Sequence, residues 1–194
     1  LAIDGGEPVR REPLPASYPG ATVLGEEEMA LLREVIEAQS PFREYGVSTP
    51  HMVRDFEREA RTYLGVPYAL GTATGSGAFY CAMAGLGLGP GDEVVVPCFS
   101  WYTCFMAPVL LGATPVFADI DRSLGMDPGD FERKITPATR AVLVVHFQGA
   151  TTDMGRILEI ARAHDVRVIE DCAQAFGVTY RGRRVGSLGD VAGF

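Results

Sequence analysis

Short apolar segments alternate with segments of helical pattern from residue 67 to residue 171. The apolar segments predict strands at 67–70, 92–97, 115–120, 140–147 and 166–171, and the segments between them predict helices at 75–86, 101–111, 127–135 and 154–165. Strands joined by helices form crossover connections, which produce a largely parallel sheet. These strands lack polar residues at every second position, so both faces of the sheet should be buried. The sequence therefore predicts an α/β fold.

The first 66 residues have a different character. Residues 1–24 contain four prolines before Gly20 and little periodicity, so we expect an extended N-terminal arm. Two amphipathic helices are predicted after it, one from Gly25 to residue 39 and one over 51–64 that ends at Gly65. The loop between them carries Phe42, Arg43 and Tyr45, which fit either a substrate-facing loop or a solvated one.

Charge and cysteine usage exclude several classes of protein. A net charge of −8 disfavours nucleic acid or an anionic membrane as the main partner. No apolar run approaches the roughly 18 residues of a membrane span, and the first residues lack a secretory pattern. The four cysteines, Cys81, Cys98, Cys104 and Cys172, show neither Cys-x-x-Cys spacing nor a zinc pattern. We expect reduced thiols, no metal and a cytoplasmic location.

A glycine-rich stretch, GTATGSG at 71–77, leads into the helix predicted at 75–86. No lysine follows the glycines, which excludes a Walker loop, and Tyr80 stands where the dinucleotide fingerprint needs its third glycine. The N–H groups of Gly75, Ser76 and Gly77 could still bind an anion at the helix N-terminus, with the hydroxyls of Thr74 and Ser76 beside them. A glycine turn that binds nothing is the alternative.

Three further residues stand at or just after the ends of predicted strands: Trp101, His146 and Asp171, with Gln174 shortly after the last. In an open parallel sheet, ligands bind at the carboxyl ends of the strands. A phosphate cradle, an aromatic ring and a carboxylate at this edge suit pyridoxal 5'-phosphate, whose ring nitrogen needs an acid partner. Trp101 could instead be a core aromatic, and Asp171 could form an ordinary salt bridge or helix cap. For His146, a hydrogen-bonding role at the strand end is preferred to acid–base chemistry.

Six motifs, in this order and spacing, resemble the DegT/DnrJ/EryC1/StrS sugar aminotransferase family. They are GTATGSGA (71–78), GLGPGDEVVVPCFSWYT (87–103), GATPVFADID (112–121), ITPATRAVLVVHFQG (135–149), VIEDCAQAFG (168–177) and GSLGDVAGF (186–194). The resemblance implies the aspartate-aminotransferase fold: a three-layer α/β/α large domain, here residues 25–194, with a mostly parallel sheet. It also implies that the small C-terminal domain lies outside these residues.

The resemblance assigns roles residue by residue. Gly75 and Ser76 match the positions that hold the cofactor phosphate, and Trp101 matches the ring stacked on the pyridine. Asp171 matches the acid on the pyridine nitrogen, and Gln174 matches the residue near the phenolic oxygen. Two positions depart from the family pattern. Gly77 stands where many relatives have threonine, and Gln148 interrupts the pattern after the histidine; its role is open.

The resemblance implies transfer of an amino group from glutamate or glutamine to a nucleotide-linked keto sugar or a keto-cyclitol, in aminosugar or antibiotic biosynthesis. It implies bound pyridoxal or pyridoxamine phosphate and a homodimer. The alternatives are a dehydratase or aromatising relative and a regulatory relative without catalysis.

Such a transaminase needs a Schiff-base lysine. The only lysine, Lys134, lies on a charged helix that enters its strand at the amino end, the wrong edge of the sheet. In the family, the segment GDVAGF continues into Ser-Phe-x-x-x-Lys. We therefore expect the catalytic lysine just beyond Phe194, in a longer polypeptide.

Overall fold

A computed structural model describes residues 4–8, 10–13, 19–43 and 51–194. Contacts within the chain divide it into two units, residues 1–54 and residues 55–194. Of the loop residues singled out above, Phe42 and Arg43 belong to the first unit, and Tyr45 lies outside the described residues. Among the described helices, none combines the length and apolar character that a membrane crossing requires.

The first unit contains a short 3₁₀ turn, η2 (Pro19–Thr22), and the helix α1 (Glu26–Glu37). Gly25 caps α1, and its N–H donates to the Glu28 carboxylate, 2.7 Å away. Three acidic residues occupy the first turn, where the positive end of the helix dipole stabilises them. The helix predicted from Gly25 is thereby confirmed, although it buries none of its side chains.

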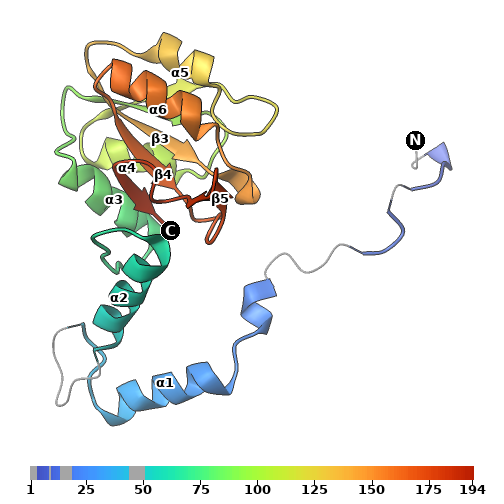
Figure 1. The fold of residues 1–194 in the computed structure, drawn as a ribbon, viewed down its shortest axis with the longest axis vertical. Helices are drawn as coiled ribbons and strands as arrows, with labels where there is room; N and C mark the ends of the chain where they lie inside the picture. The colour runs from blue at the N-terminus through green and yellow to red at the C-terminus, as the bar shows by residue number, and fades with distance from the viewer. Residues whose placement is uncertain (1–3, 9, 14–18, 44–50) are drawn as a thin grey trace. The chain divides into compact units, whose positions relative to one another are not determined.

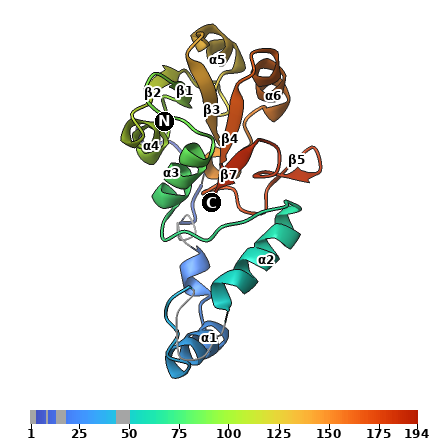
Figure 2. The ribbon, with the colours of Figure 1, turned by 90° about the vertical axis from the view of Figure 1, so that its left-hand side faces the viewer.

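The second unit is built on one parallel sheet of five strands (Figures 1 and 2). The strands are β1 (Glu93–Pro97), β2 (Thr114–Ala118), β3 (Thr139–Val145), β4 (Arg167–Asp171) and β7 (Val191–Gly193), in the order β2-β1-β3-β4-β7. A small antiparallel pair, β5 (Thr179–Tyr180) and β6 (Arg183–Arg184), lies outside it. The parallel sheet expected from the sequence is confirmed.

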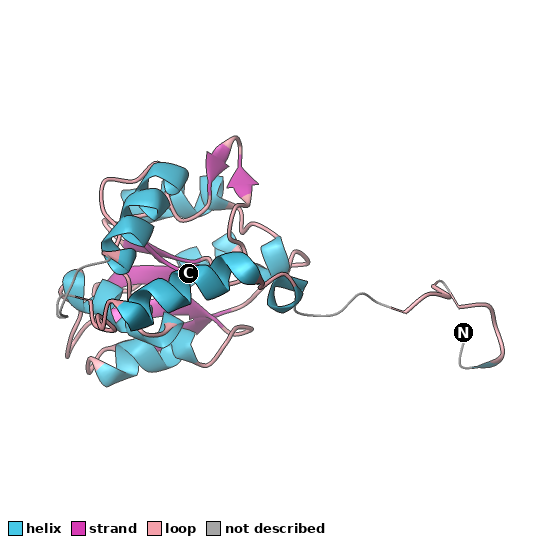
Figure 3. Ribbon diagram, turned by 90° about the horizontal axis from the view of Figure 1, so that it is seen from below, coloured by secondary structure: helices cyan, strands magenta, loops and turns pink. Residues whose placement is uncertain are grey.

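Helices cover both faces of this sheet, giving three layers (Figures 2 and 3). Successive side chains of a strand point to opposite faces. Val94 and Val96 accordingly pack with α3 (Gly75–Gly85) and α4 (Thr103–Leu110), whereas Val95 packs with α5 (Pro128–Lys134) and α6 (Met154–Ala163). The valines of β1 are fully buried, which explains why the strand reads as a continuous apolar run.

The stretch 67–70 is not a strand, so that prediction was wrong. Tyr68 is 86% exposed and Leu70 is 66% exposed, and the stretch pairs with no strand among the described residues. An extended apolar segment becomes a strand only where a neighbour supplies hydrogen bonds. The stretch follows α2 (Met52–Leu64), which ends at Gly65 as expected. Glu57 of α2 accepts the N–H of Gly71 at 2.6 Å and so holds the chain just before the glycine turn.

The strand order places a topological switch point between β1 and β3. From β1 the chain passes to β2 on one side, and the next strand, β3, lies on the other side of β1. The connections that leave β1 and β3 therefore diverge, which opens a crevice at the carboxyl edge of the sheet. Trp101, His146 and Asp171 all stand at this edge, because β1, β3 and β4 end at Pro97, Val145 and Asp171.

Candidate functional site

A cavity of about 310 Å³ lies at this edge of the sheet. All five residues singled out as site residues contribute to its lining. The lining residues are Gly75, Ser76, Phe79, Trp101, Thr103, Val145, Asp171, Ala173 and Gln174. Lys134, the last residue of α5, is not among them. Residues from four separate motifs thus meet in one place.

The glycine turn opens the helix α3 at the cavity. Thr74 is the N-cap, and its Oγ1 accepts the N–H of Gly77 at 3.0 Å. Gly77 and the Thr74 hydroxyl are therefore used within the cap, contrary to the expectation that both would face an anion. The N–H groups of Gly75 and Ser76 stand at the start of the helix, where no intrahelical acceptor exists. They carry the positive end of the helix dipole at the cavity wall.

Ser76 is tied to a second helix. Its Oγ lies 3.0 Å from Oγ1 of Thr103, the first residue of α4. Both hydroxyls line the cavity, so the N-termini of α3 and α4 meet there. Thr103 was missed by the sequence reasoning. Its position, just after the β1 strand end and at a helix start, is the signal that could have found it.

Trp101 is two-thirds exposed (66%), although it lines the cavity. Its ring centroid lies 5.4 Å from that of Tyr102, in a tilted arrangement. An indole this exposed is not a core side chain, so the core alternative is excluded. A large apolar ring exposed beside a cavity provides a surface on which a flat ligand can stack.

Asp171 ends β4 and is only 5% exposed. Its Oδ1 accepts the N–H of Ala173 at 3.0 Å, and its Oδ2 accepts the thiol of Cys104 at 3.2 Å. Burial raises the pKa of this carboxyl, although the two hydrogen bonds oppose the rise. Within the described part of the chain, no arginine or lysine forms an ion pair with it.

The salt-bridge alternative for Asp171 is therefore not supported. A carboxylate in a cavity wall without a cation is costly to ionise, because burial removes its hydration. A ligand that carries a protonated ring nitrogen would supply the missing charge. This is the strongest indication of what the cavity can bind.

Gln174 also has a defined orientation. Its Oε1 accepts the N–H of Gln148 at 2.8 Å, so the amide nitrogen is the group that can donate to a ligand. Gln148 itself adopts a left-handed conformation, with a φ of 49°, in the short turn η3 (Phe147–Gly149). The role left open for Gln148 thus involves its backbone, which holds Gln174 at the cavity.

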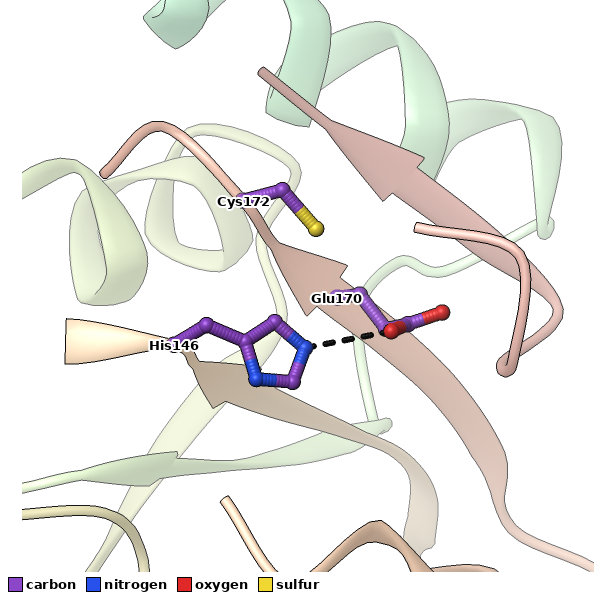
Figure 4. A group of neighbouring side chains, drawn as sticks. All are labelled: His146, Glu170 and Cys172. Atoms are coloured by element: carbon purple, nitrogen blue, oxygen red, sulfur yellow. Dashed lines mark hydrogen bonds and ion pairs between the residues drawn. The ribbon is translucent and has the colours of Figure 1, made fainter. Parts of the chain in front are cut away.

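His146 points toward Glu170 (Figure 4) and is not among the residues that line the cavity. Its Nδ1 accepts the N–H of Thr152 at 3.3 Å, so the ring proton is on Nε2. Nε2 then donates to Glu170 Oε2 at 3.1 Å. His146 is completely buried. The expected hydrogen-bonding role at the strand end agrees with these contacts.

Glu170 is the fully buried centre of this cluster. Besides His146, it accepts the N–H groups of Gly186 at 2.9 Å and of Leu188 and Gly189 at 2.7 Å each. Burial raises the pKa of Glu170, but these four hydrogen bonds together outweigh it and lower the pKa below the usual value. The carboxylate thus fixes the turn that leads into β7.

Cys172 completes a triplet of potential metal-binding side chains with His146 and Glu170 (Figure 4). The hydrogen bonds argue against a metal ion here. The nitrogen of His146 that faces Glu170 carries a proton, and Glu170 already has four donors. Burial raises the pKa of Cys172, so its thiol stays protonated. Metal ligation would require thiolate and an unprotonated imidazole nitrogen.

Residues 23–194 match the sequence profile of the DegT/DnrJ/EryC1/StrS aminotransferase family. The chain belongs to this family. It is 40% identical over 196 residues to the L-glutamine:2-deoxy-scyllo-inosose aminotransferase of Streptoalloteichus tenebrarius, a match that covers 100% of this chain and 45% of the relative. It is 43% identical over 148 residues to GDP-perosamine synthase of Caulobacter vibrioides, covering 76% of this chain and 40% of the relative.

The fold of this chain is also similar to that of solved structures. The PLP form of the sugar aminotransferase Spr1654 from Streptococcus pneumoniae superposes with a TM-score of 0.78 and 25% identity, over 87% of this chain and 46% of that one. The chain spans less than half the length of these relatives.

Proposed function

We propose that this chain carries the cofactor-binding part of a pyridoxal-phosphate-dependent aminotransferase. The observation that carries the proposal is the buried carboxylate of Asp171, which pairs with no arginine or lysine in the described part of the chain, in a cavity lined also by an exposed indole and a helix N-terminus. These three features fit the cofactor's ring nitrogen, its flat ring and its phosphate. The relationship to named aminotransferases supports the same activity.

Each residue has a separate task in this proposal. Gly75 and Ser76 bind the phosphate with their N–H groups, and Trp101 stacks on the ring. Asp171 keeps a proton on the ring nitrogen, and the amide nitrogen of Gln174 donates to the phenolic oxygen. When bound, the cofactor acts as an electron sink for the carbon that exchanges the amino group. The chain contributes orientation and electrostatic stabilisation.

We infer that the acceptor is a keto-cyclitol and the donor glutamine. The similarity to the inosose aminotransferase supports this, because it extends over the whole chain, including residues 1–24. A nucleotide-linked keto sugar is the other acceptor, supported by the perosamine synthase, whose match covers less of the chain. We also propose that the enzyme is a cytoplasmic homodimer. Met106, Val109 and Leu110 of α4 expose apolar side chains that could contribute to such an interface.

We further propose that residues 25–194 belong to a large domain that is completed beyond Phe194 by the lysine segment and a small domain. The carbonyl oxygen of Phe194 would lie 3.8 Å from a Cβ placed on Gly75, so the end of β7 emerges beside the glycine turn. Residues that follow would thus start at the cavity wall, where a lysine can reach the bound cofactor.

The intact protein should therefore contain a lysine shortly after Phe194 that bonds covalently to the cofactor. We expect a visible absorbance band and, after borohydride reduction, a peptide in which this lysine carries the cofactor mass. The protein should transfer the amino group of glutamine to 2-deoxy-scyllo-inosose faster than to a GDP-linked keto sugar. Peptide mass spectrometry identifies the modified lysine, absorbance spectroscopy detects the band, and the rate at which glutamine is consumed with each acceptor measures the transfer.

Two results would contradict this proposal. A histidine at the lysine position would favour the dehydratase branch, in which the same cofactor serves an elimination. An intact mass near 20.8 kDa with no absorbance band would favour a ligand-binding protein without catalysis.

Trp101 provides a second test of the cofactor site. Replacing it with alanine should weaken cofactor binding by about 0.5–1.5 kcal/mol beyond the loss of buried area, the range for aromatic pairs. Phenylalanine should restore much of the affinity, because it keeps a flat ring. Cofactor titration of the three proteins measures the effect. Unchanged affinity in the alanine variant would remove Trp101 from the site.

A further inference from the structure

Cys104 makes a contact that the family resemblance does not assign. It lies on α4, is completely buried, and places its Sγ 3.2 Å from Oδ2 of Asp171. Among the described residues, it is the side-chain donor to this carboxylate, and the other oxygen is held by the N–H of Ala173. The carboxyl group is thus fixed at both oxygens, from two separate elements.

The chemistry of the pair determines which group donates. Burial and then the nearby charge of Asp171 raise the pKa of Cys104 to about 12. The thiol therefore stays protonated at neutral pH. An ionised carboxylate has no proton to give, so the thiol donates and Asp171 accepts. A thiol is a weak donor. It orients the carboxylate while leaving most of the oxygen's charge for a stronger, cationic partner.

We propose that Cys104 is a positioning residue, which orients the Asp171 carboxylate toward the ring nitrogen of the cofactor. This inference rests on the proposed function. It adds that the hydrogen bond from Cys104 on α4 determines the orientation of the Asp171 carboxylate toward the ring nitrogen. Removing the thiol should therefore weaken the binding only of ligands that carry this nitrogen.

The test compares two ligands in the intact protein. Pyridoxamine 5'-phosphate binds without a covalent bond to lysine, so its dissociation constant reports the pocket contacts alone. The second ligand is its analogue with a carbon in place of the ring nitrogen. Equilibrium dialysis measures both in the wild type, Cys104→Ala, Cys104→Ser and, should alanine disturb folding, Cys104→Val. The control is Cys172→Ala, an equally buried thiol that packs with Ala175 and Val185 outside the cavity.

We expect Cys104→Ala to weaken pyridoxamine phosphate binding roughly three- to tenfold, as for a weak hydrogen bond to a charged group. Binding of the carbon analogue should change less than about twofold, because no nitrogen is there to be positioned. Cys104→Ser should retain near wild-type affinity for both ligands, because serine keeps a donor. Cys172→Ala should leave both affinities unchanged.

If Cys104→Ala weakens binding of the two ligands equally, Cys104 has a packing role and the inference is wrong. Unchanged affinity for pyridoxamine phosphate in both Cys104→Ala and Cys104→Val would also overturn the inference. A wild-type protein that binds neither ligand would instead overturn the proposed function itself. The two failures are therefore distinct, because the first leaves wild-type binding intact.

Discussion

Asp171→Asn should abolish most amino-transfer activity while leaving the protein folded. The neutral amide cannot keep a proton on the ring nitrogen, so the cofactor loses its capacity as an electron sink. The side chain keeps its size, and an amide oxygen can still accept the N–H of Ala173. Turnover should fall by at least about a hundredfold, in the range for loss of one electrostatic partner in an active site. Turnover and thermal midpoint are measured on the same preparation.

The stability of the cofactor-free protein gives an independent check. The folded pKa of Asp171 lies above its usual value because of burial, so ionisation destabilises the folded state as the pH rises through that pKa. Asparagine removes this cost. The cofactor-free variant should therefore be at least as stable as the wild type at pH 7, and the difference should vanish at low pH. An active variant would remove Asp171 from the site, and one that unfolds would indicate a structural role.

Glu170→Gln, unlike Asp171→Asn, should strongly destabilise the folded protein. Glutamine has one carbonyl oxygen and an NH₂ group, so its NH₂ must face one of two donor sets, either His146 with Gly186 or Leu188 with Gly189. Donors facing donors leave buried groups unsatisfied, which costs roughly 2–4 kcal/mol here. Chemical denaturation at pH 7 measures the free energy of unfolding.

The stability that Glu170 contributes should decrease in acid. The folded pKa of Glu170 lies below its usual value of 4.5, so the stabilisation is present above 4.5 and is lost as the pH falls through the folded pKa. The gap between the wild type and Glu170→Gln should therefore narrow in acid. A matched control is Glu159→Gln on α6, which removes only an exposed contact with Arg156 and should cost less than about 1 kcal/mol. Equal losses in the two variants would contradict the central role of Glu170.

Glu170 and Asp171 are neighbours on β4. The sequence indicated a functional role for Asp171 but gave no sign of the structural role of Glu170. Asp171 could be found, because the last residue of a buried parallel strand lies at the ligand edge of the sheet. Glu170 could not. Its partners are backbone N–H groups in the turn 186–189, which no side-chain pattern marks. The carboxylate that organises the fold was therefore missed, whereas the one at the cavity was identified.

Features that depend on local residues were predicted well, and features that depend on distant neighbours were not. The helix limits were close to those predicted, because Asp127 caps α5 and Gly65 ends α2 through local contacts. The stretch 67–70 failed because strand formation depends on a neighbour rather than on the apolar residues themselves. Thr103 and Cys104 were missed because their contacts, with Ser76 and Asp171, join segments far apart in the chain. Gln174 was found by resemblance, but its anchoring by the Gln148 backbone required the structure.

The strand order has a consequence for how the protein is made. In β2-β1-β3-β4-β7, every strand after β1 pairs with one that precedes it closely in the chain: β2 and β4 follow their partners through one helix, β3 follows β1 after the β2 unit, and β7 follows β4 after the β5–β6 pair. Short loop closures carry a small entropic cost and favour rapid folding. The sheet can therefore assemble strand by strand as the chain leaves the ribosome, since domains fold from the N-terminal side during synthesis. Trp101 and Asp171 would therefore reach their positions at the carboxyl edge as soon as β1, β3 and β4 have paired, before β7 is added to the sheet.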